Sequence, residues 1–66
     1  MTLTVNGERK TVADGLTLAQ LVEELRLVPG RLASEVNGAV VRRAEYATTV
    51  LSDGDAIEIV QMIGGG

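Results

Sequence analysis

The sequence lacks the side chains that carry out most enzymatic chemistry. Its 66 residues include no cysteine and no histidine. Without cysteine there is no disulfide, thiolate ligand or thiol nucleophile, and without histidine the commonest general base is missing. We therefore expect no catalytic residue and no metal site, and an independent enzyme is the least favoured class of function. The absence of cysteine also favours a reducing compartment, so we expect a cytoplasmic protein.

Aromatic and basic residues are equally scarce. Tyr46 is the only aromatic residue, and six lysines and arginines stand against nine aspartates and glutamates, which gives a net charge of −3. One ring makes no stacking platform and scattered basic residues make no phosphate-binding stripe, so we expect no nucleic-acid partner. Residues 1–10 alternate apolar and polar residues without a long apolar core, so we expect neither a signal peptide nor a membrane span.

The N-terminal twelve residues have the pattern of a β-hairpin. Leu3 and Val5 alternate with threonines, which is the period of a strand. The dipeptide Asn6-Gly7 follows, and it tolerates the positive φ angles of a type I′ turn. We expect the return strand over residues 8–12.

The clearest helix begins after residues 13–15. Thr17 is a favourable N-cap, and Gln20 stands three residues later, where a capping box requires it. Pro29-Gly30 is expected to end the helix. Four apolar residues then share one helical face, which is expected to pack on the sheet: Leu18, Leu21, Val22 and Leu25.

The second half of the chain is predicted to consist mainly of short strands. A strand is expected over residues 32–36, followed by a second Asn-Gly turn and a strand over residues 39–41. One helical turn is expected over residues 44–47, and the most hydrophobic strand over residues 56–63.

These elements predict an α+β fold with a mixed sheet and one main helix packed on one face. The chain between the first and last strands is long enough for a crossover, so the two can lie parallel. The economical solution is a β-grasp, or ubiquitin-like, architecture. We expect one β-grasp domain over residues 1–63 and a flexible glycine tail over residues 64–66.

Strand alternation assigns the residues of the last strand to two faces. Ile57 and Ile59 are expected under the helix, which leaves Val60 and Met62 on the open face. Exposed apolar residues beside the tail predict a docking surface formed by Val60, Met62 and Ile63.

The last three residues, Gly64, Gly65 and Gly66, form the thinnest tail that a chain can have. Glycine has no Cβ, so an extended tail fits a narrow channel. Residues 63–66 would reach roughly 13 Å beyond the sheet at the usual rise per extended residue. Gly66 carries the α-carboxylate, which we predict to be the reactive group. A frayed or inert linker is the alternative for the triplet taken alone.

Seven segments, taken in their order and spacing, run along essentially the whole length: Val5-Asn6-Gly7-Glu8, Asp14-Gly15-Leu16-Thr17, Leu21-Val22-Glu23-Glu24-Leu25, Val36-Asn37-Gly38-Ala39-Val40-Val41, Arg43-Ala44-Glu45-Tyr46, Leu51-Ser52-Asp53-Gly54-Asp55 and Gly64-Gly65-Gly66. Together they resemble the ThiS family of sulfur-carrier proteins, small β-grasp proteins of thiamine biosynthesis. Two positions depart from the family pattern, since Tyr46 stands where the family often has Trp and Arg42 where it often has Pro.

The resemblance implies a carrier that is itself a substrate. A ThiF-like, E1-like enzyme would adenylate the Gly66 carboxylate with ATP and Mg²⁺, which the enzyme and not this chain would bind. Sulfur from a cysteine persulfide would displace AMP and leave a thiocarboxylate. The thiocarboxylate would donate its sulfur to thiazole formation on a ThiG-like synthase. The carrier itself would hold no cofactor.

Other functions are compatible with this sequence. Some would use the glycine tail in another way, and one would not use it. A MoaD-like carrier, or a carrier for another thiolated product, would use the same adenylate in another pathway. A protein modifier would join Gly66 to a lysine. A non-covalent β-grasp interaction module would leave the glycines inert.

Overall fold

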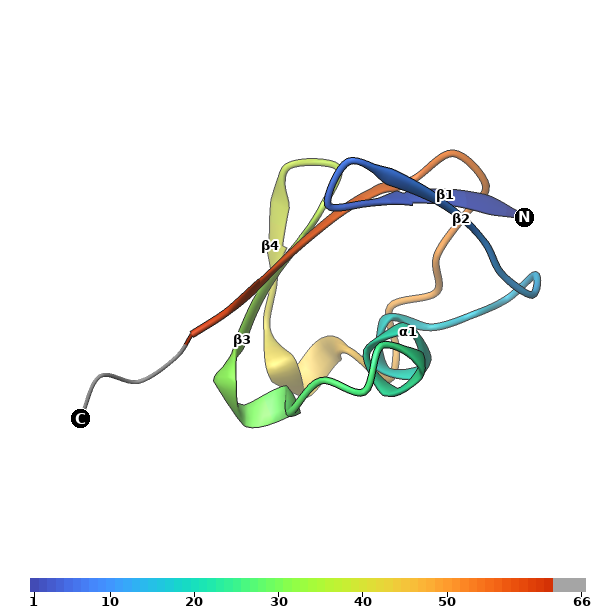
Figure 1. Cartoon of the computed structure of the whole chain (residues 1–66). Coiled ribbons are helices and arrows are strands. Elements are labelled where there is room, and N and C mark those ends of the chain that lie inside the picture. The colour runs from blue at the N-terminus through green and yellow to red at the C-terminus, as the bar shows by residue number, and fades with distance from the viewer. Residues whose placement is uncertain (63–66) are drawn as a thin grey trace.

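The computed structural model describes residues 1–62, and they form one mixed sheet with a helix on one side (Figure 1). The main helix is α1 (Leu18–Glu24), and two 3₁₀ turns are η1 (Pro29–Arg31) and η2 (Arg43–Glu45). The strands are β1 (Thr2–Val5), β2 (Glu8–Thr11), β3 (Leu32–Val36), β4 (Ala39–Val41) and β5 (Ala56–Gln61).

The strand order β2-β1-β5-β3-β4 places the last strand in the middle of the sheet. β5 is parallel to β1, with Val5 opposite Ile57, and antiparallel to β3, with Ser34 opposite Ile59. The β1–β2 and β3–β4 pairs are antiparallel hairpins. This is the β-grasp arrangement predicted from the sequence, including the parallel contact between the first and last strands.

The core lies between α1 and the inner face of the sheet. Leu18, Leu21 and Val22 of α1 are buried, as the helical stripe predicts. Opposite them are buried residues of β1 and β5, among them Leu3 and Ile57. Each fully buried leucine contributes about 1.5–3 kcal/mol relative to an exposed one. Leu25, the fourth residue of the predicted stripe, is only partly buried against this core.

The start of α1 was predicted correctly. The Thr17 side chain accepts a hydrogen bond from the Gln20 backbone N–H (3.2 Å), and the Gln20 side chain accepts one from the Thr17 N–H (2.9 Å). This capping box satisfies two backbone donors that a helix start leaves free.

The predicted end of α1 at Pro29-Gly30 is wrong, because the helix ends at Glu24. Arg26 adopts a left-handed conformation (φ 58°), its N–H bonds to the Glu23 carbonyl, and the Leu27 N–H bonds to the Val22 carbonyl. These two bonds form a Schellman motif, which terminates a helix. Glycine is the usual residue at this position, so an arginine gives little sequence signal. Pro29 instead begins η1.

Both Asn-Gly turns are type I′ in character, with positive φ at Asn6, Gly7, Asn37 and Gly38. They also hold β5 from its two sides. The Asn6 side chain accepts from the Ile59 N–H (2.8 Å) and donates to the Ile59 carbonyl (3.1 Å). The Asn37 side chain accepts from the Ala56 N–H (2.9 Å). Each asparagine therefore adds side-chain bonds to the backbone ladders of β5.

The last strand is shorter than predicted. Residues 56–63 were expected to be extended, but β5 ends at Gln61. Met62 follows the strand, and its N–H still bonds to the Arg31 carbonyl (2.7 Å). Ile63 and the three glycines lie outside the described residues. The helical turn expected over residues 44–47 is η2, which begins one residue earlier.

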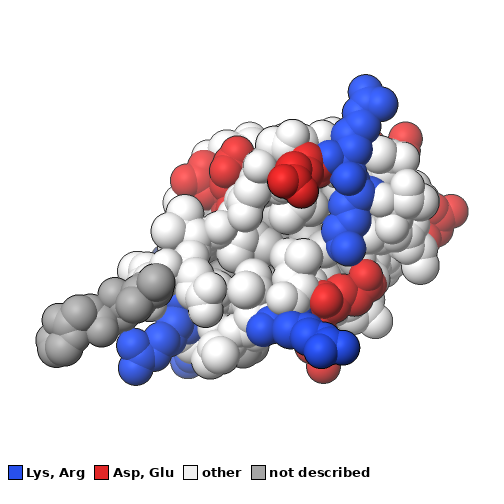
Figure 2. Space-filling view, in the orientation of Figure 1, with Lys and Arg blue, Asp and Glu red and all other residues white. Residues whose placement is uncertain are grey.

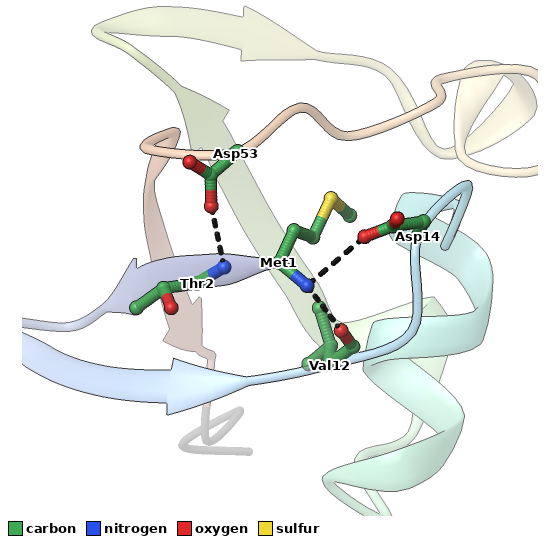
Figure 3. Close-up of polar contacts among 5 residues, drawn as sticks. All are labelled: Met1, Thr2, Val12, Asp14 and Asp53. Atoms are coloured by element: carbon green, nitrogen blue, oxygen red, sulfur yellow. Dashed lines mark hydrogen bonds and ion pairs between the residues drawn. The ribbon is translucent and has the colours of Figure 1, made fainter.

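The N-terminal end of the sheet is fixed by polar contacts (Figure 3). The Met1 ammonium donates to the Val12 carbonyl (2.8 Å) and to Asp14 (3.0 Å), and the Thr2 N–H donates to Asp53 (2.7 Å). β1 is thereby joined to the segment after β2 and to the turn before β5. This region and the end of β5 lie at opposite ends of the molecule (Figure 1).

One polar pair lies within the core. The Tyr46 hydroxyl and the Ser34 hydroxyl are 2.8 Å apart, and both residues are almost fully buried, at 4% and 1% exposure. Their mutual hydrogen bond satisfies two hydroxyls that would otherwise be buried without partners.

Candidate functional site

The site predicted from the sequence lies where β5 ends. β5 is paired on both sides, so its direction is fixed by two neighbours. At its end Gln61 is opposite Leu32, and the Met62–Arg31 hydrogen bond continues the β3 side by one residue. A central strand that is paired on both sides therefore precedes the C-terminal residues.

Beside this end the sheet presents a face that no described residue covers. We call it the outer face, and it is the side opposite α1. Val60 and Met62 are 59% and 55% exposed, and Val40 is 76% exposed. By register the half of the outer face formed by β5, β3 and β4 comprises Ala33 and Glu35 of β3, Val40 of β4, Glu58 and Val60 of β5, and Met62 after β5. The other half includes Thr4 of β1, Arg9 of β2 and Ala56 of β5.

The structure places two of the predicted docking residues as expected. Val60 and Met62 are exposed, while Ile57 and Ile59 are buried under α1, so the predicted alternation is correct. No bulge interrupts the register of β5 with β3. Ile63, Gly64, Gly65 and Gly66 lie outside the described residues, so the predictions for them stay predictions.

Arginines gather near the end of β5. Arg31 is the last residue of η1, and its backbone carbonyl accepts the hydrogen bond from the Met62 N–H. Arg42 and Arg43 follow β4. The Arg43 Nη1 atom lies 3.0 Å from the position that a Cβ on Gly30 would occupy, so this guanidinium packs against η1. Blue side chains are visible at this end of the molecule (Figure 2). The chain is acidic overall, yet this end is locally basic.

Potential metal ligands do not cluster in the described residues, and one hollow has a polar lining without a nucleophile–base pair. Within residues 1–62 there is no group of three or more potential metal ligands. A hollow of about 440 Å³ lies between the β1–β2 hairpin and the segment after α1. Its polar lining is Asn6, Glu8, Arg9 and Lys10, which include no nucleophile with an adjacent base.

Nothing in the described part of the chain has the length and apolarity of a membrane-crossing helix.

Strand alternation also places Glu58 on the outer face, and it is exposed as expected. Sequence reasoning missed Ala33, Glu35 and Val40 as members of this face. The alternation within β3, where Leu32 and Ser34 are buried, carries a signal for Ala33 and Glu35. Their position beside β5 depends on the register between strands distant in sequence, which no local pattern specifies.

Comparisons with known proteins agree on one family. The model of the ThiS family matches residues 3–66. The chain is 32% identical to the sulfur carrier protein ThiS of Escherichia coli, with both chains covered completely. The crystal structure of the thiamine biosynthesis protein (ThiS) from Geobacter metallireducens superposes with a TM-score of 0.86, at 38% identity and with both chains covered completely.

Two longer relatives contain a region similar to the whole chain. It is 38% identical to part of a thiazole synthase of Paramagnetospirillum magneticum and 42% identical to part of one from Magnetococcus marinus. The chain spans 20% of the length of each of these proteins.

Proposed function

Because this chain belongs to the ThiS family of sulfur carrier proteins of thiamine biosynthesis, we propose that its Gly66 carboxylate is the group that carries sulfur. The carrier is a substrate of enzymes and not an enzyme. The observation that supports the proposal most directly is the family match, which extends through Gly66 and includes the terminal glycines. The central position of β5, which leads into those glycines, is consistent with it.

The carboxylate needs activation before it can accept sulfur, because its negative charge is delocalised and makes its carbon a poor electrophile. A carboxylate oxygen attacks the α-phosphorus of ATP and pyrophosphate leaves, which gives an acyl-adenylate. A persulfide sulfur then attacks the carbonyl carbon and AMP leaves. A thiol cleaves the S–S bond of the resulting acyl disulfide and releases the thiocarboxylate.

Each of these steps requires groups that the sequence does not contain. ATP and Mg²⁺ would be bound by a ThiF-like activating enzyme, and the persulfide would be formed on a cysteine of another protein. This chain has no cysteine and no histidine. Gly65 and Gly64 would let the tail enter a narrow active-site channel, since they have no side chains.

The proposed partners share one docking region. Val60, Met62 and Ile63 would contact the activating enzyme and a ThiG-like thiazole synthase next to the tail. The existence of thiazole synthases that contain a region similar to this chain supports the second partner. These reactions would take place in the cytoplasm.

Mass spectrometry of the intact protein tests the proposal. The chain is incubated with ATP, Mg²⁺, a ThiF-like enzyme and a persulfide donor. We expect a mass gain equal to the replacement of one oxygen by one sulfur, located at Gly66 by fragmentation. Deletion of Gly66 is expected to abolish the gain. The proposal is refuted if the mass of this chain does not change although the same enzyme activates its own carrier in a parallel reaction.

The same experiment separates the alternatives. A ladder of larger species would show conjugation to lysines and therefore a protein modifier. Transfer of the sulfur to a product other than a thiazole would place the carrier in another pathway, such as that of MoaD-like proteins.

A further inference from the structure

Gly30 is the one glycine of residues 1–62 that no backbone angle explains. The other four have a positive φ, at which residues with a side chain are strained: Gly7, Gly15, Gly38 and Gly54. Gly30 lies in η1 without a positive φ, so alanine could adopt the same conformation and would lose less chain entropy on folding. The reason for a glycine at this position therefore lies in its surroundings.

The space beside Gly30 is occupied by the Arg43 side chain. A Cβ at position 30 would lie 3.0 Å from the Nη1 atom of Arg43, which is closer than ordinary van der Waals contact. The segment before β3 and the segment after β4 lie side by side in Figure 1, in agreement with this distance. The absence of a side chain at Gly30 therefore lets the guanidinium pack against η1, and we call this packing the Arg43–Gly30 contact.

Arg43 extends from a turn that is attached to both layers of the fold. Tyr46 follows η2, and its N–H donates to the Arg43 carbonyl (3.1 Å). The Tyr46 carbonyl accepts a hydrogen bond from the Ala19 N–H of α1 (3.0 Å), and its hydroxyl is bonded to Ser34 of β3 (2.8 Å). The backbone that carries the Arg43 side chain is therefore fixed to the helix and to the sheet.

The backbone of η1 is bonded to the residue that precedes the C-terminal segment. Val28 comes before η1, is 59% exposed and has no side-chain group that could cap the turn. The Arg31 N–H donates to the Val28 carbonyl (3.1 Å), which closes the turn on itself. The Arg31 carbonyl accepts the Met62 N–H at 2.7 Å, and Met62 is the last described residue. A contact that holds η1 in place therefore also holds Met62 in place.

We propose that Arg43 is a positioning residue for the loading of sulfur. Its guanidinium packs on Gly30 and stabilises η1, and η1 holds Met62 through a backbone hydrogen bond. The place at which residues 63–66 begin is thereby set by a side chain from η2. A segment that is already in place has less freedom to lose on binding, so the contact raises affinity for the activating enzyme. This inference rests on the proposed function, since it specifies how the reactive end is presented.

Amide hydrogen exchange tests the contact without any enzyme. Gly30→Ala displaces the guanidinium and keeps its charge, and Arg43→Ala removes the guanidinium. In both variants we expect exchange at the Met62 N–H to become about tenfold faster, because its bond to η1 opens more often. Exchange is expected to be unchanged at the Ile59 N–H, which bonds to the Asn6 side chain (2.8 Å). The double variant is expected to match the single ones, since both changes remove one contact.

Steady-state kinetics of a ThiF-like enzyme test the consequence for loading. Pyrophosphate release is measured with ATP and Mg²⁺ at varied concentrations of the carrier. For Gly30→Ala and Arg43→Ala we expect the KM for the carrier to rise about tenfold, as when the correctly placed fraction falls to a tenth. The kcat is expected to stay the same, because the bound carrier presents the same carboxylate. Gly30→Ala is expected to be no less stable than wild type, so a loss of folding would not explain the higher KM.

Arg42→Ala is the matched control, since it removes an exposed arginine one residue earlier whose side chain forms no cap hydrogen bond. It is expected to have the KM and the Met62 exchange rate of wild type. Unchanged exchange at Met62 in either Gly30→Ala or Arg43→Ala would overturn the inference, as would faster exchange with an unchanged KM. An equal rise in KM for the control would also overturn it, because loss of positive charge would then explain the effect. Failure of the proposed function is separate, because wild type would then gain no sulfur, while exchange at Met62 would still report on the Arg43–Gly30 contact.

Discussion

At the scale of single residues, the hydrogen bond between Tyr46 and Ser34 is the polar contact most enclosed by the core. Tyr46 comes from the segment after η2 and Ser34 from β3, so the bond fixes a loop against the sheet.

Tyr46→Phe is expected to lower the free energy of unfolding by about 1–3 kcal/mol, because the Ser34 hydroxyl would be left buried without a partner. Chemical denaturation with urea measures the loss. The double variant Tyr46→Phe/Ser34→Ala is expected to recover part of it, since both polar groups are then absent. A single variant as stable as wild type would show that water replaces the tyrosine hydroxyl.

At the scale of secondary-structure elements, the two Asn-Gly turns do more than reverse the chain. Asn6 and Asn37 approach β5 from its two sides and bond to backbone groups of Ile59 and Ala56. The turns that close the two hairpins therefore also position the strand that leads to the tail. This couples hairpin formation to the placement of β5.

Asn6→Gly separates the two roles of this residue. Glycine adopts the positive φ of Asn6 without strain, but it removes both side-chain bonds to Ile59. We expect the free energy of unfolding to fall by about 1–2 kcal/mol. Each of the two hydrogen bonds contributes roughly 1 kcal/mol, and hydrogen bonds to water offset part of the loss. Amide hydrogen exchange is expected to be faster at the Ile59 N–H and unchanged in α1. Unchanged exchange at Ile59 would contradict the role given to the side chain.

At the scale of the whole molecule, the body and the proposed reactive end are separate in sequence. The buried hydrophobic residues run from Leu3 to Ile59. Within residues 1–62 the last element is β5, which ends at Gln61. The proposed chemistry lies entirely after this strand, at Gly66. Fold stability and sulfur transfer are therefore expected to respond to different substitutions.

Deletion of residues 64–66 tests this separation. We expect the free energy of unfolding to change by less than about 0.5 kcal/mol, as for surface changes away from the core. The same deletion is expected to abolish sulfur loading completely. Circular dichroism during thermal unfolding measures the first effect and intact mass the second. A large loss of stability would mean that the glycines pack on the body.

Much of this architecture could be predicted from local sequence. The stripe from Leu18 to Leu25, the capping box and the Asn-Gly turns determined the elements, and the alternation around Ile57 determined which face is exposed. The end of α1 was mispredicted because Arg26 adopts a left-handed conformation, which glycine usually adopts at the end of a helix. The alternation also placed Glu58 on the open face, but its pairing with Glu35 depends on tertiary register, which no local pattern specifies.

The central position of β5 has a mechanical consequence. A partner that draws the C-terminal residues into a channel applies force along β5, and that strand is hydrogen-bonded to β1 on one side and β3 on the other. The load is shared by two ladders in shear, and the asparagine side chains add to the resistance at both edges of the strand. An edge strand would peel away one bond at a time under the same pull. The carrier can therefore be held by its end and still keep its shape.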